Sequence, residues 1–400
     1  MSNTLGNYDP IFYAQEALIA LNKALGMAGR VHRGYDPNPQ QKGSVINITR
    51  PSVFEATEVN TSTGGTTQAV TPENVSITLD TWKEVKFGLT DKELTFTKEK
   101  IITDHITPAA YALADAIDLS LVGLYKKIPW KEAISATPVV TDITGVRKAL
   151  FNNKVPMNDL HFMVDGSVEA GLLALTAFAT ADGSGQAGID TQLRGSLGTR
   201  YGFEFFANQN TPAHTSGTAT DLTGALNANV SAGATSFVVK SLTAESTFKA
   251  GDILKITGDD QQYVLTEDVT LGGAATTATV SVFPAIRKNA LADAVVTLVL
   301  PSGSGTTKNQ CLAFHRHAFA LAMAPLSDMG GRLGAQIATV ADPVTNLSIR
   351  SRLWYEGNTS TVKVALDALW GVQVLNPNLA VRAVPLGEVL TPLSFFVLRR

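Results

Sequence analysis

The sequence is poor in cysteine, with one such residue, Cys311, in a chain of 400. A single cysteine cannot form an intrachain disulfide or build a cysteine-rich zinc module, so both ways of stabilising a fold are excluded. No apolar run approaches the roughly 18 uninterrupted residues of a membrane-spanning helix, and the N-terminus lacks the basic segment and apolar core of a secretory signal. We therefore expect a soluble protein that is made and used without secretion.

The chain also lacks an excess of either charge. Lysine and arginine number 32 against 35 for aspartate and glutamate, which gives a formal net charge of -3. Tight nonspecific binding to DNA or RNA depends on positive charge that releases counterions from the phosphates, so it is not expected here. Hydrophobic residues make up 44% of the chain and charged residues 17%, which is typical of a chain with buried cores.

The N-terminal quarter combines a helix with a long polar connection. Asp9 and Pro10 are a typical helix start, and apolar residues then recur at helical spacing until Gly26. Strands are expected at residues 44–49 and 75–87, and the connection between them has almost nothing to bury. Because ordering each residue costs about 1 kcal/mol or more, a compact monomer seldom carries such a connection. We expect an arm that is ordered by contact with another subunit.

The best-defined helix is expected to begin at Thr107, as its cap, and to end before Pro129. Alanine, leucine and isoleucine recur along one stripe of this segment at helical spacing. Asp115, Asp118 and Lys126 occupy the other side, which predicts a helix that is covered on one face only.

The second half of the chain changes composition twice. Short helices and strands alternate from residue 139 to 211, which predicts a mixed α/β unit. Between Thr211 and Thr307, short runs rich in valine, isoleucine and threonine are separated by turn residues at roughly ten-residue intervals. This pattern is typical of a small all-β barrel or sandwich. Its flexible borders predict an insertion into the α/β unit.

The stretch "LAFHRHAFALAMAPL", residues 312–326, places two histidines before an alternating apolar run. As one strand it would put His315, His317 and Met323 on one face and alanines on the other. Such a histidine pair binds zinc only with a third ligand, and the remaining histidines show no ligand spacing among themselves. We favour a buried strand with polar residues at its entry, and predict no metal site.

Three other patterns are weak as catalytic or binding sites. The stretch "GSGQAG", residues 183–188, matches a phosphate-binding pattern but follows a helical stretch instead of a strand, which favours a surface loop. Four residues along a strand separate Cys311 from His315 by about 13 Å, so a buried structural thiol is favoured over a nucleophile. The carboxylate pairs Asp259–Asp260 and Glu267–Asp268 fit solvated turns, with calcium binding left open. The sequence predicts no catalytic residue, no cofactor and no enzyme activity.

Three stretches carry a resemblance to a known family. They are "LRGSLGTRYGFEFFANQNTP" (193–212), the histidine-containing stretch 312–326, and "SIRSRLWYEGNTSTVKVALDALWGVQVLNPNLAVRA" (348–383). In these stretches and in the order of its parts, the chain resembles the major capsid proteins of tailed phages with the HK97-like fold. It is most similar to the P22-like coat proteins, which carry an extra inserted domain.

The resemblance implies an α+β fold of six parts. These are an N-terminal arm and helix (1–42), an extended two-stranded loop (43–90), a peripheral domain with a spine helix (91–132), the first part of a central or axial domain (133–211), an inserted β-barrel-like domain (212–307), and return strands with a C-terminal tail (308–400).

The resemblance also implies a function. It predicts a major capsid protein whose copies self-assemble, as hexamers and pentamers, into the icosahedral shell of a tailed double-stranded DNA phage. The expected partners are a scaffolding protein and a portal, with DNA enclosed without sequence-specific binding and no membrane partner. The expected location is the virion, after assembly in the bacterial host cytoplasm. A near-zero net charge suits a wall that encloses DNA without gripping it.

Two alternatives stay open from the sequence. One is another phage virion protein, of the tail or baseplate, against which the long helix and the α/β unit argue. The other is a carbohydrate-acting enzyme with a β-accessory domain, which would need paired carboxylates that converge in a cleft.

Overall fold

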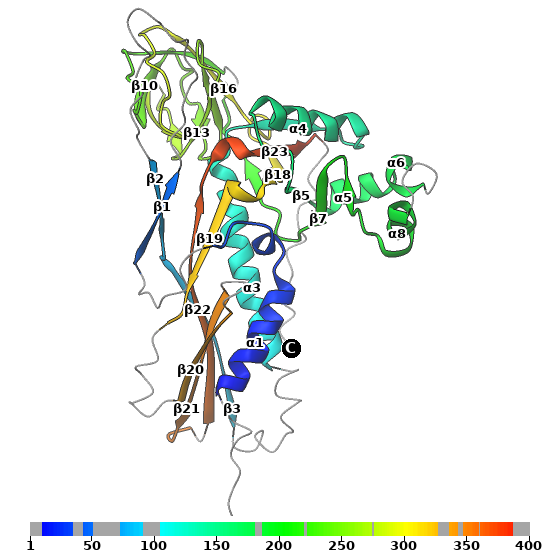
Figure 1. Ribbon diagram of the computed structural model, residues 1–400. Helices are drawn as coiled ribbons and strands as arrows, with labels where there is room; N and C mark the ends of the chain where they lie inside the picture. Colours follow the sequence, from blue (N-terminus) through cyan, green and yellow to red (C-terminus); the bar gives the residue numbers. More distant parts are fainter. Residues whose placement is uncertain are drawn as a thin grey trace, which may run out of the picture. The chain divides into compact units, whose positions relative to one another are not determined.

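Helices and strands are mixed throughout the computed structural model, which confirms an α+β protein. The structure describes residues 10–34, 43–50, 73–90, 105–180, 186–219, 222–273, 276–326, 336–342, 347–359 and 361–386. The chain divides into two compact units. Figure 1 labels the helices and strands that make them up. The first comprises Met1–Leu25, Arg33–Ile117 and Ala320–Leu375, and the second Gly26–His32, Asp118–Phe319 and Asn376–Arg400.

The first unit is built on a five-stranded sheet. Its strands β19 (Phe319–Ala324), β22 (Thr361–Val374), β21 (Leu347–Glu356) and β20 (Gln336–Asp342) follow in that order, and β3 (Thr81–Thr90) also pairs with β22. The helix α1 (Pro10–Ala24) contacts β20 and β21. Its buried residues Tyr13, Ala14, Ala17 and Leu21 recur at helical spacing, as the sequence predicted.

A two-stranded sheet of β1 (Val45–Arg50) and β2 (Glu73–Thr78) completes this unit. The sequence predicted a single strand over residues 75–87, which was wrong. The chain bends at Leu79 and Asp80, so that β2 pairs with β1 while β3 pairs with β22. Leu79 closes the end of the hairpin, because its N–H donates to Ser44 and its carbonyl accepts from Gly43.

The second unit contains a six-stranded sheet in the order β4 (Lys131–Ile134), β23 (Ala380–Pro385), β18 (Cys311–His315), β5 (Leu160–Val164), β7 (Phe203–Ala207) and β6 (Thr199–Arg200). Apolar side chains from one face of this sheet form a core with the helices α4 (Val140–Asn152) and α5 (Gly166–Leu173). Two further helices, α6 (Thr176–Ala179) and α8 (Gln186–Arg194), follow α5 along the chain.

A closed six-stranded barrel forms the rest of this unit. Its strands are β9 (Thr223–Leu226), β10 (Ser236–Lys240), β15 (Ala278–Phe283), β13 (Gln262–Leu265), β12 (Ile253–Ile256) and β16 (Val295–Val299). The chain enters and leaves through two paired strands, β8 (Ala213–Thr215) and β17 (Thr307–Asn309), while β11 (Thr247–Phe248) pairs with β14 (Val269–Thr270). Alternating burial along β10 and β16 reflects side chains that point into and out of the barrel.

The stretch 312–326 is not one strand, so the predicted alternation of its two faces was wrong. Strand β18 ends at His315, a 3-10 turn covers Arg316–Ala318, and β19 begins at Phe319. The turn forms because the ring Nδ1 of His315 accepts a hydrogen bond of 3.2 Å from the backbone N–H of His317. The two strands then join different sheets. The predicted burial is confirmed, because every residue of β18 and β19 is buried.

The long helix α3 spans Thr107–Val122 and continues as a 3-10 turn over Gly123–Lys127, close to the predicted length. The prediction that Asp118 faces solvent was wrong, because this residue is buried. Within the described chain, no helix is long and apolar enough to cross a membrane. Several predicted features lie outside the described residues: the polar arm at 51–72, residues 183–185 of the glycine-rich stretch and the tail at 387–400.

Candidate functional site

Within the second unit, Asp118 holds the segment Gly26–His32, which follows α1. Its carboxylate accepts hydrogen bonds from the backbone N–H groups of Gly26 (3.1 Å), Met27 (3.4 Å) and Ala28 (3.2 Å), and from the side-chain amide of Asn208 (3.3 Å). Burial raises the pKa of Asp118, and the hydrogen bonds from the segment only partly offset this. The carboxylate therefore satisfies three amides that an apolar side chain would leave without partners.

A second polar contact continues from this segment. Arg30 donates from Nε (3.0 Å) and Nη2 (2.8 Å) to one carboxylate oxygen of Glu204, whose other oxygen lies 3.1 Å from Nδ1 of His161. The guanidinium of Arg30 also stacks over Phe206, with 4.3 Å from its central carbon to the ring centroid. These contacts hold residues 26–32 against β5 and β7.

Four histidines come near one another in the second unit. The ring of His317 lies 5.0 Å from that of His32 and 5.3 Å from that of His315, measured between centroids, and His161 acts electrostatically on His315. No group of three or more histidine, cysteine or acidic side chains is placed to hold a metal ion among the described residues. The rings are neighbours without forming a metal centre.

Burial is the main cause that lowers the pKa of His32, His161 and His315, and the positive charge of His317 adds to it at His32 and His315. A histidine whose folded pKa lies below its unfolded value binds its proton more readily in the unfolded chain. Such a histidine does not affect the stability of the fold above its unfolded pKa of about 6.5. It lowers the stability increasingly as the pH falls through that value.

We expect the second unit to lose stability as the pH falls from about 7.5 to about 5.5, the range in which unfolded histidines take up protons. Urea unfolding at several pH values measures this loss. Replacing both His32 and His315 with asparagine should flatten the dependence, because fewer buried rings then resist protonation. An equally steep decline in this double variant would contradict the assignment.

A buried polar network lies where the barrel joins the rest of its unit. The ring of His214, on β8, lies 3.2 Å from the phenol oxygen of Tyr125 and, through Nε2, 3.1 Å from Oδ1 of Asp252. Asp252 also accepts from the N–H groups of Gly217 (3.0 Å) and Lys249 (2.8 Å). Burial raises the pKa of Tyr125 to about 12, so its phenol stays protonated. The network resembles a triad only in residue types, because it is fully buried and no nucleophile is exposed.

The first unit has its own buried ion pair. Asp367, in the middle of β22, has 0% exposure and accepts from Nε (3.0 Å) and Nη2 (2.6 Å) of Arg350, its register partner on β21. Arg352 lies 3.3 Å from the same carboxylate, and Trp82 on β3 donates from its indole N–H over 3.1 Å. One carboxylate thus joins three adjacent strands.

Three of the four carboxylates that the sequence raised as calcium ligands have separate partners, and the fourth, Asp260, is exposed. Asp259 accepts from the phenol of Tyr263 over 2.5 Å, Asp268 pairs with Lys249 at 2.7 Å, and Glu267 accepts from Ser281 at 3.3 Å. The structure does not bring these carboxylates together as one ligand set.

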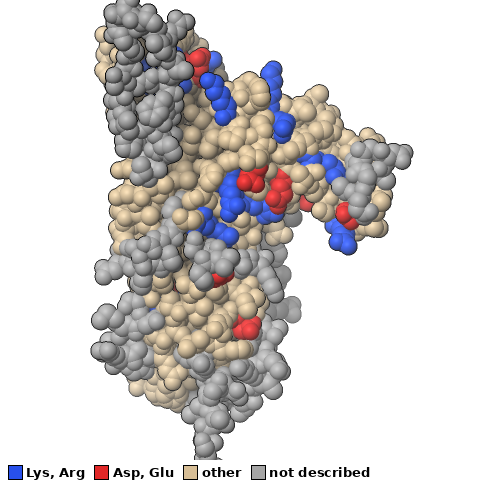
Figure 2. Space-filling view, viewed as in Figure 1, with Lys and Arg blue, Asp and Glu red and all other residues tan. Residues whose placement is uncertain are grey.

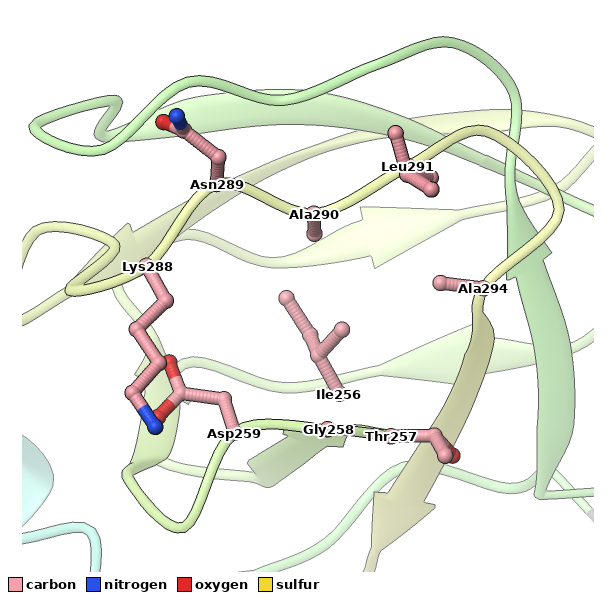
Figure 3. Close-up of a pocket in the computed structure, with 9 residues that line it drawn as sticks. All are labelled: Ile256, Thr257, Gly258, Asp259, Lys288, Asn289, Ala290, Leu291 and Ala294. Carbon is pink, nitrogen blue, oxygen red and sulfur yellow. The ribbon is translucent and has the colours of Figure 1, made fainter.

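A cavity of about 240 Å³ lies in the barrel (Figure 3). Ile256 points into it, Asp259 and Lys288 line one side, and Leu291 lies at the opposite rim. The carboxylate of Asp259 already accepts a hydrogen bond from Tyr263. The cavity is therefore lined by apolar side chains such as Ile256 and by few polar groups that are free to bind a ligand.

Cys311 is buried, as predicted, and burial raises the pKa of its thiol well above the ordinary value. A thiol in this state is a poor nucleophile. Residues 186–188 of the glycine-rich stretch form the start of helix α8, so the prediction of a surface loop was wrong for these three residues.

Large apolar side chains are exposed on several separate elements. Among them are Ile11 and Ile19 on α1, Tyr111 and Leu119 on α3, Phe151 on α4, Ile189 and Leu193 on α8, Leu291 and Val295 in the barrel segment, and Tyr355 on β21. Leu193 is 76% exposed and lies one turn from the 38% exposed Ile189, so the two form an adjacent apolar pair. On the face drawn in Figure 2, basic and acidic side chains are interspersed and form no continuous field over the described residues.

Neither a protein-family model nor a curated protein matches the sequence. The chain is similar to several solved structures at low identity. The mature capsid of bacteriophage PhiM1 is 11% identical, with 92% of this chain and 88% of that chain covered and a TM-score of 0.47. The capsid of cyanophage P-SCSP1u is 12% identical, with 90% and 87% covered and a TM-score of 0.46.

A virus-like particle from Pyrococcus furiosus is 9% identical, with 93% of this chain and 97% of that chain covered and a TM-score of 0.39. The phage structures are of the class that the sequence resemblance indicated. With identities of 12% or less and TM-scores below 0.5, the function rests on the chain's own residues.

Sequence reasoning named no site residue, and it missed the residues that organise the buried polar contacts. Asp118, Asp252, Asp367 and Arg382 are all buried. Asp367 offered a usable signal, because a lone acid in the apolar run "VKVALDALWGV" is costly to bury without a partner. Asp118 gave none, since its partners lie about 90 residues away in the sequence.

Proposed function

We propose that this chain is the major capsid protein of a tailed double-stranded DNA phage, with the HK97-like fold, and that its copies form an icosahedral shell of hexamers and pentamers. The observation that carries the proposal is the set of large apolar side chains exposed on separate elements of both units. A single binding site needs one such surface. A subunit that tiles a closed shell needs several, because each copy meets different neighbours on different sides.

Polar groups favour this function over the enzyme alternative. A glycosidase needs two carboxylates facing a common cleft. Asp259, Glu267 and Asp268 have separate partners, and Asp118, Asp252 and Asp367 are buried in structural hydrogen bonds. These six acidic side chains are thus engaged in structural contacts within the chain.

The remaining parts of the proposal follow the resemblance. The six-part division at residues 42, 90, 132, 211 and 307 is the expected domain organisation, with the barrel as the inserted domain and the P22-like group as the nearest type. The polar arm would contact a neighbouring copy. Weak contacts at many fixed positions give a stable lattice through effective concentration. A scaffolding protein, a portal, enclosed DNA, assembly in the host cytoplasm and a final place in the virion belong to the same proposal.

Electron microscopy of the full-length protein, expressed alone and with its neighbouring phage genes, tests the function. Closed shells or curved lattice sheets are expected. Monodisperse small particles that hydrolyse a polysaccharide would support the enzyme alternative, and tubes or rings would support a tail or baseplate protein. Either of these results would overturn the proposal.

Deleting residues 55–72 is expected to leave a folded subunit that forms no shells, because the arm would no longer reach its neighbour. Circular dichroism checks folding, and sedimentation velocity measures assembly. In a second variant, a glycine–serine linker of the same length replaces residues 55–72, so the chain stays connected but the side chains of the arm are lost. This variant should also fail to assemble. Normal shells from either variant would show that the arm is not a subunit contact.

A further inference from the structure

Arg382 is a buried cation whose side chain has no hydrogen-bond partner among the described residues. It lies on β23 with 0% exposure. Its Nε, Nη1 and Nη2 atoms are all buried and make no hydrogen bond within the part of the chain that the structure describes. A guanidinium carries five N–H donors and stays charged at neutral pH, so burying it without a counter-charge is strongly unfavourable. A group in this state is suited to bind an anion.

The alternation of β23 places this guanidinium on a definite face of the six-stranded sheet. Its neighbours Val381 and Ala383 belong to the core that packs under α4 and α5. Arg382, between them, therefore points to the opposite face. Its register partners are Leu312 on β18 and Lys131 on β4.

Two lysines lie close to the guanidinium. Lys131 is its parallel partner on β4, and Lys308 is on β17, which contacts β23. Both lysines are half-buried. Burial lowers the pKa of Lys131, and the positive charges of Arg382 and Lys308 lower it further. Three positive groups thus share one region of the unit.

Asp252, the acidic residue that acts electrostatically on Arg382, makes its hydrogen bonds to other groups. Asp252 has 0% exposure, and its two oxygens accept from His214, Gly217 and Lys249 at 2.8 to 3.1 Å. The phenol of Tyr125 is neutral and lies beside His214. Burial lowers the pKa of Arg382 to about 10. Tyr125 and Asp252 act in the opposite direction, but more weakly. Asp252 thus contributes one negative charge beside three positive groups, Arg382, Lys131 and Lys308, so positive charge remains in excess here.

We propose that Arg382, Lys131 and Lys308 bind a small inorganic anion on this face of the sheet. Because the guanidinium is fully buried, a free small ion suits it better than a nucleic-acid phosphate or an acidic segment of a partner, each of which is attached to a larger molecule. The half-buried lysines provide the approach. The planar fork of an arginine suits an oxyanion, and chloride is the smaller alternative within the same class. The ion would stabilise the sheet next to the barrel, and the binding is independent of the shell-forming function.

Thermal unfolding of the full-length protein at constant ionic strength tests the site, with sodium methanesulfonate replaced stepwise by sodium chloride or sodium phosphate. At one hundred times Kd, an anion that binds only the folded state should raise Tm by about 3 °C and then saturate. Arg382→Met should remove the saturable rise for both anions. Lys255→Met is the matched control, because Lys255 is an exposed cation on the barrel strand β12, and it should retain the rise.

A second variant keeps the test decisive if Arg382→Met does not fold. Lys131→Met retains the guanidinium, and it should raise the anion concentration at half-saturation about tenfold, as loss of one partly buried charge predicts. Line broadening of chloride in ³⁵Cl NMR gives an independent readout of binding. The proposal is overturned if neither anion raises Tm in the wild type, or if Arg382→Met shows the same rise. Water would then satisfy the guanidinium.

Discussion

Replacing Asp367 with alanine is expected to destabilise the first unit by about 3–5 kcal/mol, because it leaves the buried guanidinium of Arg350 without its counter-charge. The pair is bidentate and lies in the middle of the sheet, where water cannot take over the lost bonds. Urea unfolding followed by tryptophan fluorescence measures the effect. Three of the four tryptophans, Trp82, Trp354 and Trp370, belong to this unit.

Glu84→Ala is the matched control for this experiment. Glu84 is the register partner of Asp367 on β3 and also pairs with an arginine, Arg352. Its side chain is 48% exposed, so its loss should cost less than about 1 kcal/mol. Combining Asp367→Leu with Arg350→Met should recover much of the stability, because no buried charge is then left alone. Equal costs for Asp367→Ala and Glu84→Ala would contradict the role of the buried pair.

Replacing Asp118 with alanine is expected to cost about 3 kcal/mol, about 1 kcal/mol for each of three amides left without an acceptor. The loss should be local to the segment after α1. Hydrogen exchange at Gly26, Met27 and Ala28 would become faster, while the barrel amides would keep their protection. Asp118→Asn should cost less than alanine, because it keeps one acceptor oxygen and removes a charge that burial disfavours.

Substitutions at two glycines of the same segment also test the contact between this segment and Asp118. A Cβ atom at Gly26 would lie 2.7 Å from Oδ2 of Asp118, whereas one at Gly29 would meet nothing within 4 Å. Gly26→Ala should therefore loosen the segment in the same way as Asp118→Ala, and Gly29→Ala should not. If both glycine variants behave like the wild type, the carboxylate is not what holds this segment.

Much of the secondary structure could be predicted from local patterns. The helices α1 and α4 follow from apolar spacing, and the barrel strands follow from short β-branched runs between turns. The errors fall where a distant contact decides the local structure. The strand expected over 75–87 is broken because its two halves pair with different strands, β1 and β22. The turn at Arg316–Ala318 exists because the chain passes from one sheet to another.

The buried charges were harder to predict than the elements that carry them. Asp118 looked exposed because it lies opposite the apolar stripe of α3, and its partners are about 90 residues away in sequence. The neighbouring rings of His32 and His317 likewise come from segments far apart along the chain. The spacing of residues in the sequence predicts contacts within one helix or strand. These contacts join different elements, so they depend on how the elements pack.

The sequence by itself determined the α+β class, the position of the long helix and of the β-rich segment, and the burial of Cys311 and of the strands around it. Only the tertiary structure decided which polar groups are buried and what satisfies them: Asp118 by three backbone amides, Asp367 by Arg350, and Arg382 by no described residue. The reason is physical. Periodicity encodes which side of an element avoids water, but the fate of a charge depends on the partner that folding brings to it.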